Sequence, residues 1–233
     1  MGSRRSSGWR RAPHGLLGVG YLFEVLEGIL YYMPRPTRFT AEAILDSSLA
    51  LVSERGPSAL TITAAADRLG APSGSIYHRF SGRAALAGAL WLRSVRRFQA
   101  GFLSALDDPD PMRAARRAAM HVVRWSRDNP SEARLLLLHR SEDLAHTDWP
   151  RDLRAENAAL RKQLERAIGE LCTSLAARNS GSRRRVRFAV VDIPYAAVRQ
   201  SLAAGGRLHP SLDKLVEEAV TALLAPLPIW EGR

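Results

Sequence analysis

The chain has 233 residues, of which 46% are hydrophobic, so it can bury a substantial core in one domain or in a small domain joined to a larger one. Its formal net charge of +11 points to a polyanionic partner, either nucleic acid or an anionic membrane surface. Cys172 is the only cysteine, which excludes an intrachain disulfide and fits a reducing, cytoplasmic setting. The helical pattern around it favours a buried thiol over a catalytic one.

The N-terminal segment raises the question of a signal peptide or a membrane anchor, because residues 15–32 are mostly apolar and follow several arginines. Glu24 and Glu27 interrupt this run, and no small-residue cleavage site follows it. The run is therefore a poor transmembrane span. We interpret residues 1–39 as an N-terminal extension and expect the natural start near Met33.

Beyond this extension, apolar residues recur at helical spacing and strand patterns are lacking, so the sequence predicts an all-α fold of about nine helices. The expected helices cover about residues 40–55, 61–69, 73–80, 83–106, 111–128, 131–140, 150–177, 186–204 and 211–225. Residues 107–111 form a turn, residues 141–150 a loop that serves as a plain connector or a gate, and residues 179–185 a polar linker. Pro194 should kink or divide its helix.

The second and third helices have the spacing of a helix-turn-helix. Ala66 is small enough for the third helix to cross closely, and Gly70 tolerates the positive φ of the turn. Ile76, ten positions after Ala66, is expected to pack against the second helix, with Leu69 and Phe80 completing the cluster.

Burial of these positions leaves an outward face that can bond phosphate oxygens or base edges. This face carries Ser73, Ser75, Tyr77, His78 and Arg79. Gly74 would let a DNA backbone or a base edge approach closely. A helix of this width fits the major groove.

The segment "LTITAAADRLGAPSGSIYHRFSGRAAL", residues 60–86, resembles the DNA-binding signature of the tetracycline-repressor (TetR) family of bacterial regulators. The matching landmarks are Thr61, Ala66, Gly70, Gly74, Ser75, Tyr77, Phe80, Arg83 and Leu86. The resemblance implies a homodimer that reads a pseudo-palindromic operator and releases it when a small effector binds. It also implies a helix-turn-helix domain at 40–86, an effector-binding and dimerisation domain at 87–227, and a short tail at 228–233.

The resemblance also implies roles for single residues. Thr61, Ser75, Tyr77 and Arg83 would contact phosphates. Ser73, Gly74, His78 and Arg79 would lie against bases or backbone. Pro72 stands where the family has a capping serine, so we expect Ser73 to cap the third helix. The other arginine clusters, 93–97, 113–117 and 183–187, are expected to be solvated faces rather than DNA sites.

The sequence offers little support for catalysis. Its histidines lack metal-ligand spacing, and no phosphate loop or nucleophile motif occurs, so we predict neither enzymatic activity nor a cofactor. Aromatic and amphipathic residues on the family's cavity helices are candidates for an effector pocket, although each could instead be core. They are Trp91, Phe98, His121, Arg124, Trp125, His139, Asp192 and Tyr195. Arg124 or Asp192 would supply the polar groups that orient a ligand.

The last two helices carry apolar stripes that could cover their own core, but the resemblance favours a four-helix dimer interface. The first stripe is Phe188, Val191, Tyr195, Val198 and Leu202, and the second is Leu212, Leu215, Val216, Ala219 and Leu223.

Two functions remain open. The chain is either a ligand-responsive DNA-binding repressor or a helical small-molecule-binding or structural protein whose helix-turn-helix no longer binds DNA. Retention of Ser75, Tyr77 and Arg83 argues for the first. The effector, the operator sequence, the choice between repression and activation, and the status of residues 1–32 stay undetermined at this level.

Overall fold

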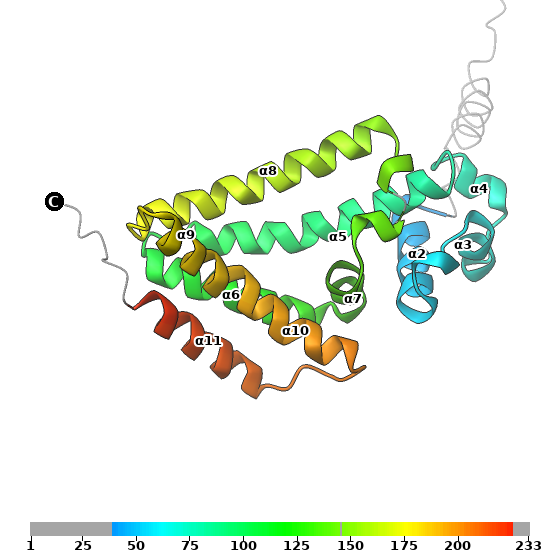
Figure 1. Cartoon of the computed structure of the whole chain (residues 1–233). Helices are drawn as coiled ribbons and strands as arrows, with labels where there is room; N and C mark the ends of the chain where they lie inside the picture. Colours follow the sequence, from blue (N-terminus) through cyan, green and yellow to red (C-terminus); the bar gives the residue numbers. More distant parts are fainter. Residues whose placement is uncertain (1–38, 145, 226–233) are drawn as a thin grey trace, which may run out of the picture. The chain divides into compact units, whose positions relative to one another are not determined.

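The computed structural model describes residues 39–144 and 146–225, all of whose regular structure is helical (Figure 1). The predicted all-α class is therefore confirmed for these residues. Our expectations for the N-terminal extension, for a start near Met33 and for the tail at 228–233 lie outside the described residues. No helix in the described ranges is both long enough and apolar enough to cross a membrane.

The N-terminal helices are α2 (Ala41–Arg55), α3 (Ile62–Leu69) and α4 (Ser73–Tyr77), with a 3₁₀ turn at Pro57–Ala59 between the first two. Thr40 caps α2, as its Oγ1 accepts a hydrogen bond of 3.1 Å from the Ala43 amide. These short helices share one core with the start of the long helix α5 (Arg83–Leu106).

The central helices are α6 (Pro111–Asp128), α7 (Pro130–Leu138) and α8 (Arg151–Ser174). The predicted loop before α8 forms two 3₁₀ turns, Ser141–Leu144 and His146–Asp148, followed by a fully buried Trp149. The Trp149 indole donates a 2.9 Å hydrogen bond to the carbonyl of Leu144. Leu144 and Trp149 belong to the core that α5 shares with the N-terminal helices, so this segment is more than a connector.

The predicted linker at 179–185 is wrong, because most of it is helix α9 (Ser180–Arg187). Asn179 and Ser182 form a reciprocal capping box at 2.8 and 3.2 Å, which stabilises a helix start in a very polar segment. Because residues 179–185 show no periodic apolar pattern, the Asn179–Ser182 capping pair was the signal in the sequence that could have revealed this helix.

The C-terminal helices are α10 (Ile193–Ala203) and α11 (Ser211–Leu224). A π-helical turn at Phe188–Asp192 separates α9 from α10, and the Ile193 amide bonds to the carbonyl of Phe188, five residues back. Pro194 cannot donate to the carbonyl four residues before it, so a local change of helical pitch is expected at this point. The prediction that Pro194 divides its helix is confirmed.

Helix α5 takes part in two hydrophobic cores. Its first half packs with α2–α4, Leu135 and Trp149, and its second half packs with α6 and the C-terminal helices. In Figure 1, α5 runs from the N-terminal helices along α8 and α6. A rigid rod of 24 residues thus joins the N-terminal helices to the C-terminal bundle.

Candidate functional site

The turn between α3 and α4 has the geometry of a helix-turn-helix. Thr61 begins α3 as its N-cap, since its Oγ1 accepts a 3.0 Å hydrogen bond from the Ala64 amide. Gly70 ends α3 in the left-handed region, with φ 64° and ψ 34°. A residue with a Cβ is strained in that conformation, which explains why the turn uses glycine.

The packing predicted for this motif is confirmed, because Ala66 and Ile76 are both fully buried and lie in one core with Phe80. The expected capping by Ser73 is wrong: α4 begins at Ser73 itself, its N-cap is Pro72, and no side chain caps it. Proline needs no amide partner at a helix start, so the extended conformation of Pro72 is sufficient to begin the helix.

The outward face of α4 is open to solvent. Tyr77 exposes 57% of its surface, and His78 and Arg79 are also exposed. No atom lies within 4 Å of a Cβ built on Gly74, so this position leaves space for a closely approaching backbone. Ser73 and Ser75 are half-buried beside it.

Two arginines of the predicted DNA-contact set already bind carbonyl groups of the chain itself. The Arg83 guanidinium donates to Leu60 O at 2.7 Å and to Pro57 O at 3.1 Å. Arg79 Nε donates to Phe39 O at 3.0 Å. Both side chains therefore brace the motif, and only their remaining N–H groups are available to a phosphate.

The interpretation of residue 93 as part of a solvated face is wrong. The Arg93 side chain is only 4% exposed, and its Nη1 binds Asp46 Oδ1 at 2.8 Å and Glu42 Oε2 at 3.0 Å. The two carboxylates belong to α2 and the arginine to α5. This ion pair network ties the first helix of the motif to the long central helix.

A second set of polar contacts continues this link to α7. Arg97 binds Glu132 at 3.1 Å and Glu42 at 3.3 Å, and the Ser94 hydroxyl lies 3.5 Å from Glu132 Oε1. Glu132 is 4% exposed and sits in the first turn of α7. The carboxylate of Glu132 is thus buried but compensated by a charge-assisted hydrogen bond.

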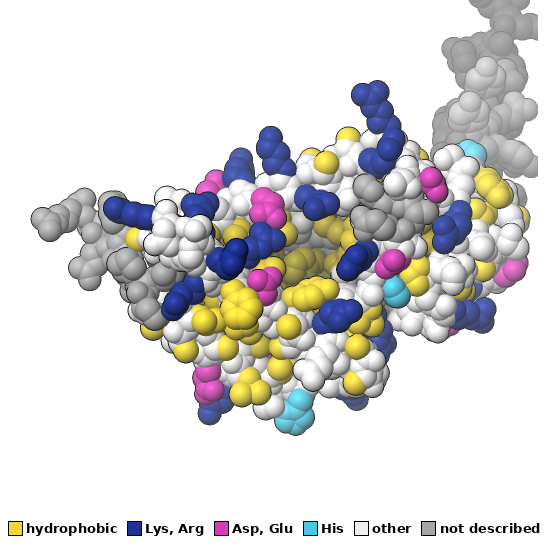
Figure 2. Space-filling view, viewed as in Figure 1, with side chains coloured by type: hydrophobic (Ala, Val, Ile, Leu, Met, Phe, Trp, Pro, Cys, Tyr) yellow, Lys and Arg dark blue, Asp and Glu magenta, His cyan; other side chains and the backbone are white. Residues whose placement is uncertain are grey.

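An apolar cavity of about 220 Å³ lies among α5, α6, α7, α8 and the start of α10. Its lining consists of Trp91, Val95, Phe98, Gln99, Phe102, Val122, Trp125, Ser126, Leu136, Leu137, Leu164, Ile168, Val191 and Tyr195. Figure 2 shows hydrophobic side chains in the depression between α8 and α10. The Phe98 and Trp125 rings meet edge to face with centroids 5.2 Å apart, which fixes one wall.

Four of the eight predicted pocket residues line this cavity, namely Trp91, Phe98, Trp125 and Tyr195. The other four, His121, Arg124, His139 and Asp192, do not. Arg124 and Asp192 are exposed, since each lies on the outer side of its helix.

His121 packs on the far side of Phe98, and its Nε2 lies 2.9 Å from Phe98 O. Burial lowers the pKa of this imidazole, only partly opposed by that hydrogen bond, so the ring is neutral at pH 7. His121 is thus a structural residue of the α5–α6 contact; with Arg124 it lines a separate hollow of about 570 Å³ and not the apolar cavity.

Gln99 and Ser126 were missed by sequence reasoning, and they add an amide and a hydroxyl group to the lining of the cavity. Gln99 interrupts the apolar face of α5 between Phe98 and Phe102, and that interruption was the available signal. Val122 and Leu164 were also missed, because aliphatic residues carry no signal that separates cavity from core.

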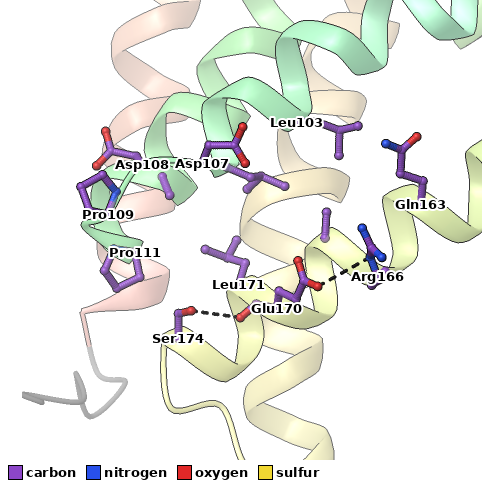
Figure 3. Close-up of a pocket in the computed structure, with 13 residues that line it drawn as sticks. Leu103, Asp107, Asp108, Pro109, Pro111, Gln163, Arg166, Glu170, Leu171 and Ser174 are labelled. Carbon is purple, nitrogen blue, oxygen red and sulfur yellow. Dashed lines mark hydrogen bonds and ion pairs between the residues drawn. The ribbon is translucent and has the colours of Figure 1, made fainter.

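A second hollow of about 290 Å³ lies between the α5–α6 connection and the last turns of α8 (Figure 3). Its polar groups bind one another: Arg166 lies 3.6 Å from Glu170, and the Ser174 hydroxyl donates to Glu170 O at 3.1 Å. Arg113 and Arg117 hold the pKa of Asp108 well below its usual range. These groups need no ligand, so the apolar cavity is the stronger candidate.

Comparison with known proteins gives a match of residues 44–90 to the family model of bacterial regulatory proteins, tetR family. This N-terminal region is therefore similar to the DNA-binding part of tetR-family regulators. A search of curated protein sequences gives no significant match.

Similarity to solved structures with the same fold covers most of the chain. The fatty acid degradation regulator FadR from Bacillus halodurans is 15% identical with a TM-score of 0.61, covering 86% of this chain and 99% of that one. FadR from Bacillus subtilis in complex with stearoyl-CoA is 13% identical with a TM-score of 0.61, covering 81% and 100%. The ketosteroid regulator KstR2 of Mycobacterium tuberculosis is 17% identical with a TM-score of 0.57, covering 80% and 94%. The tetR fold is therefore shared along nearly the whole of the described residues.

The apolar stripes proposed for a tetR-type dimer interface divide into three groups by exposure. Val198, Leu202 and Val216 are buried inside the protomer, where they pack in its own core, so they cannot face a partner. Val191, Leu212, Ala219 and Leu223 are half-buried. Phe188, Tyr195 and Leu215 remain 48%, 40% and 59% exposed and are the members able to contact a second chain.

Proposed function

We propose that this protein is a homodimeric transcription regulator that binds operator DNA through α3 and α4 and releases it when a small effector enters the apolar cavity. The observation that carries this proposal is the form of α4. Its inward residue, Ile76, is fully buried, while Tyr77, His78 and Arg79 face solvent beside the unobstructed Gly74. A DNA target sets the place of action in the bacterial cytoplasm.

The hydroxyl groups around α4 suit phosphate contact. The Thr61 oxygen accepts the Ala64 amide, which leaves its proton free to be donated to a phosphate. Ser75 and Tyr77 offer two further hydroxyls at the same edge. Ser73 and His78 are the proposed groups for base contact, and Arg83 is now assigned mainly to bracing the motif.

The homodimer is proposed because one helix-turn-helix reads only a few base pairs, so tight binding needs two half-sites. Phe188 and Leu215 are large apolar side chains left exposed on the C-terminal helices. These two side chains are the candidates for contact with the second chain.

Effector binding is proposed to reach the DNA-binding helices through α7. Leu136 and Leu137 of this helix line the cavity, and Leu137 O accepts hydrogen bonds from Tyr195 and Arg199, each at 3.2 Å. At the other end of α7, Glu132 binds Arg97, which also binds α2. If the ligand binds the protein more tightly when α7 lies in another position, it would move α7 to that position and would shift α2 with it.

The proposal is tested by selecting bound sequences from a random pool of duplex DNA and measuring affinity for the enriched site. Tyr77→Phe removes one hydroxyl and should weaken binding roughly three- to tenfold on every sequence, as a phosphate contact does. Thr173→Val, which removes an exposed hydroxyl from α8 outside the helix-turn-helix, is the control. A pool without enrichment would favour the alternative, a helical protein that no longer binds DNA.

A further inference from the structure

The apolar cavity contains two buried polar groups that the protein leaves without partners. Gln99 is 5% exposed and Ser126 is 1% exposed, and neither Gln99 Oε1 nor Ser126 Oγ has a hydrogen-bond partner in the structure. Both residues line the cavity. They lie on facing turns of α5 and α6, because their neighbours Phe98 and Trp125 are in ring contact.

Among residues 39–144 and 146–225, the other buried serine hydroxyls are satisfied internally. Ser48 donates to Ile44 O at 2.8 Å, the usual bond of a serine inside a helix, and Ser47 donates to Ala65 O at 3.0 Å. Ser126 makes no such bond to the preceding turn. Since a buried polar group without a partner costs stability, the pair at 99 and 126 calls for a partner from outside the chain.

The chemistry of the lining restricts what that partner can be. None of the residues that line the cavity is charged, so a carboxylate or phosphate inside it would stay uncompensated. The carboxamide oxygen of Gln99 requires a donor, and the Ser126 hydroxyl can donate or accept. A hydroxyl or an amide group meets both needs without a charge.

The size of the cavity points to a compact molecule. An engineered protein cavity of roughly 150 Å³ holds benzene. The cavity here measures about 220 Å³, which fits one substituted ring or a molecule of similar bulk. The aromatic walls suit such a ring.

We propose that the effector, or the part of it that enters the cavity, is an uncharged, mainly apolar alcohol, phenol or amide whose polar group binds Gln99 and Ser126. This inference rests on the proposed function only in taking the cavity as the effector site. It assigns specificity to two residues that carry no charge.

Three matched probes test the chemistry by isothermal titration calorimetry of the full chain: para-ethylphenol, ethylbenzene and para-ethylbenzoate. The phenol should bind about tenfold more tightly than the hydrocarbon, the worth of one hydrogen bond, and the benzoate more weakly than both. Gln99→Met should reduce the phenol to the affinity of ethylbenzene, whereas Gln200→Met, at an exposed glutamine outside the cavity, should change neither. Equal affinities, tightest binding of the benzoate, or no binding of any probe would overturn the proposal.

Thermal melting without ligand gives a second test. Gln99→Met removes an unsatisfied oxygen and should raise the melting temperature by about 2–4 °C. A lower melting temperature would mean that Gln99 is already satisfied in the folded chain and would overturn the proposal. The same preparations are assayed for selection of DNA sequences. If the protein binds DNA but does not discriminate among the three probes, only this inference is refuted. If it discriminates among the probes but binds no DNA, only the proposed function is refuted.

Discussion

Glutamate substitutions at Val198 and at Leu215 distinguish an effect on protomer folding from an effect on dimer association. Both residues belong to the apolar stripes expected at a dimer interface. Val198 on α10 is fully buried within the protomer, whereas Leu215 on α11 is 59% exposed. A carboxylate at the first position must enter the core, while at the second position it points to water until a partner covers it.

The two substitutions should differ greatly in cost to the protomer. Val198→Glu loses about 1.5–3 kcal/mol of apolar burial and adds several kcal/mol for an unpaired buried charge. That sum approaches the roughly 5–15 kcal/mol that stabilises a whole domain, so this variant should not fold. Leu215→Glu should change the free energy of unfolding of the protomer by no more than about 0.5 kcal/mol, as exposed substitutions do.

In a dimer, Leu215→Glu should cost several kcal/mol of association, and each 1.4 kcal/mol raises the dissociation constant about tenfold. The assay is light scattering after size exclusion at several concentrations, with helical circular dichroism as the measure of folding. Lys214→Glu changes the charge of the neighbouring exposed residue without removing an apolar side chain and serves as the control. If Leu215→Glu remains as dimeric as the wild type, Leu215 lies outside the interface. If Val198→Glu folds normally, the assignment of Val198 to the core is wrong.

Three further predictions follow from single contacts. Arg97→Ala should keep operator and effector binding but weaken the effector-induced release of the operator. This release is measured as the change in operator affinity at saturating effector. Full release would show that the contact between Arg97 and Glu132 carries no coupling. Arg113 and Arg117 hold the pKa of Asp108 below its unfolded value, so the stabilisation by this carboxylate is present above about pH 4 and is lost as the pH falls towards the folded pKa. Asp108→Asn should therefore lower the melting temperature at pH 7, and the difference from the wild type should shrink in acid. A difference independent of pH would contradict this. A Cβ added at Gly101 would clash with the His121 ring, whose Cε1 is the nearest atom and whose Nδ1 lies 2.8 Å away. The clash of about 1–3 kcal/mol exceeds the gain of about 1 kcal/mol in helix propensity, so urea denaturation of Gly101→Ala should show a loss of stability that His121→Ala partly relieves. A stabilised Gly101→Ala would show that the ring moves away freely.

The helix-turn-helix could be predicted from sequence because its determinants are local. The need for positive φ at Gly70, the cap at Thr61 and the burial of Ile76 depend on residues within about fifteen positions of one another. The division at Pro194 was predictable for the same reason, since proline acts on its own turn. Such features need no knowledge of what packs on the helix from afar.

Tertiary packing alone decided which apolar face is covered, and by what. Periodicity marks Val198 and Leu215 alike as apolar positions, yet Val198 is buried in the core of the C-terminal helices and Leu215 remains exposed. The same limit hid the cavity: its walls come from five separate helices, and the buried oxygens of Gln99 and Ser126 become unsatisfied only when those helices assemble. Helical periodicity follows from the geometry of one element, whereas burial and hydrogen-bond satisfaction depend on neighbours brought together from distant parts of the chain.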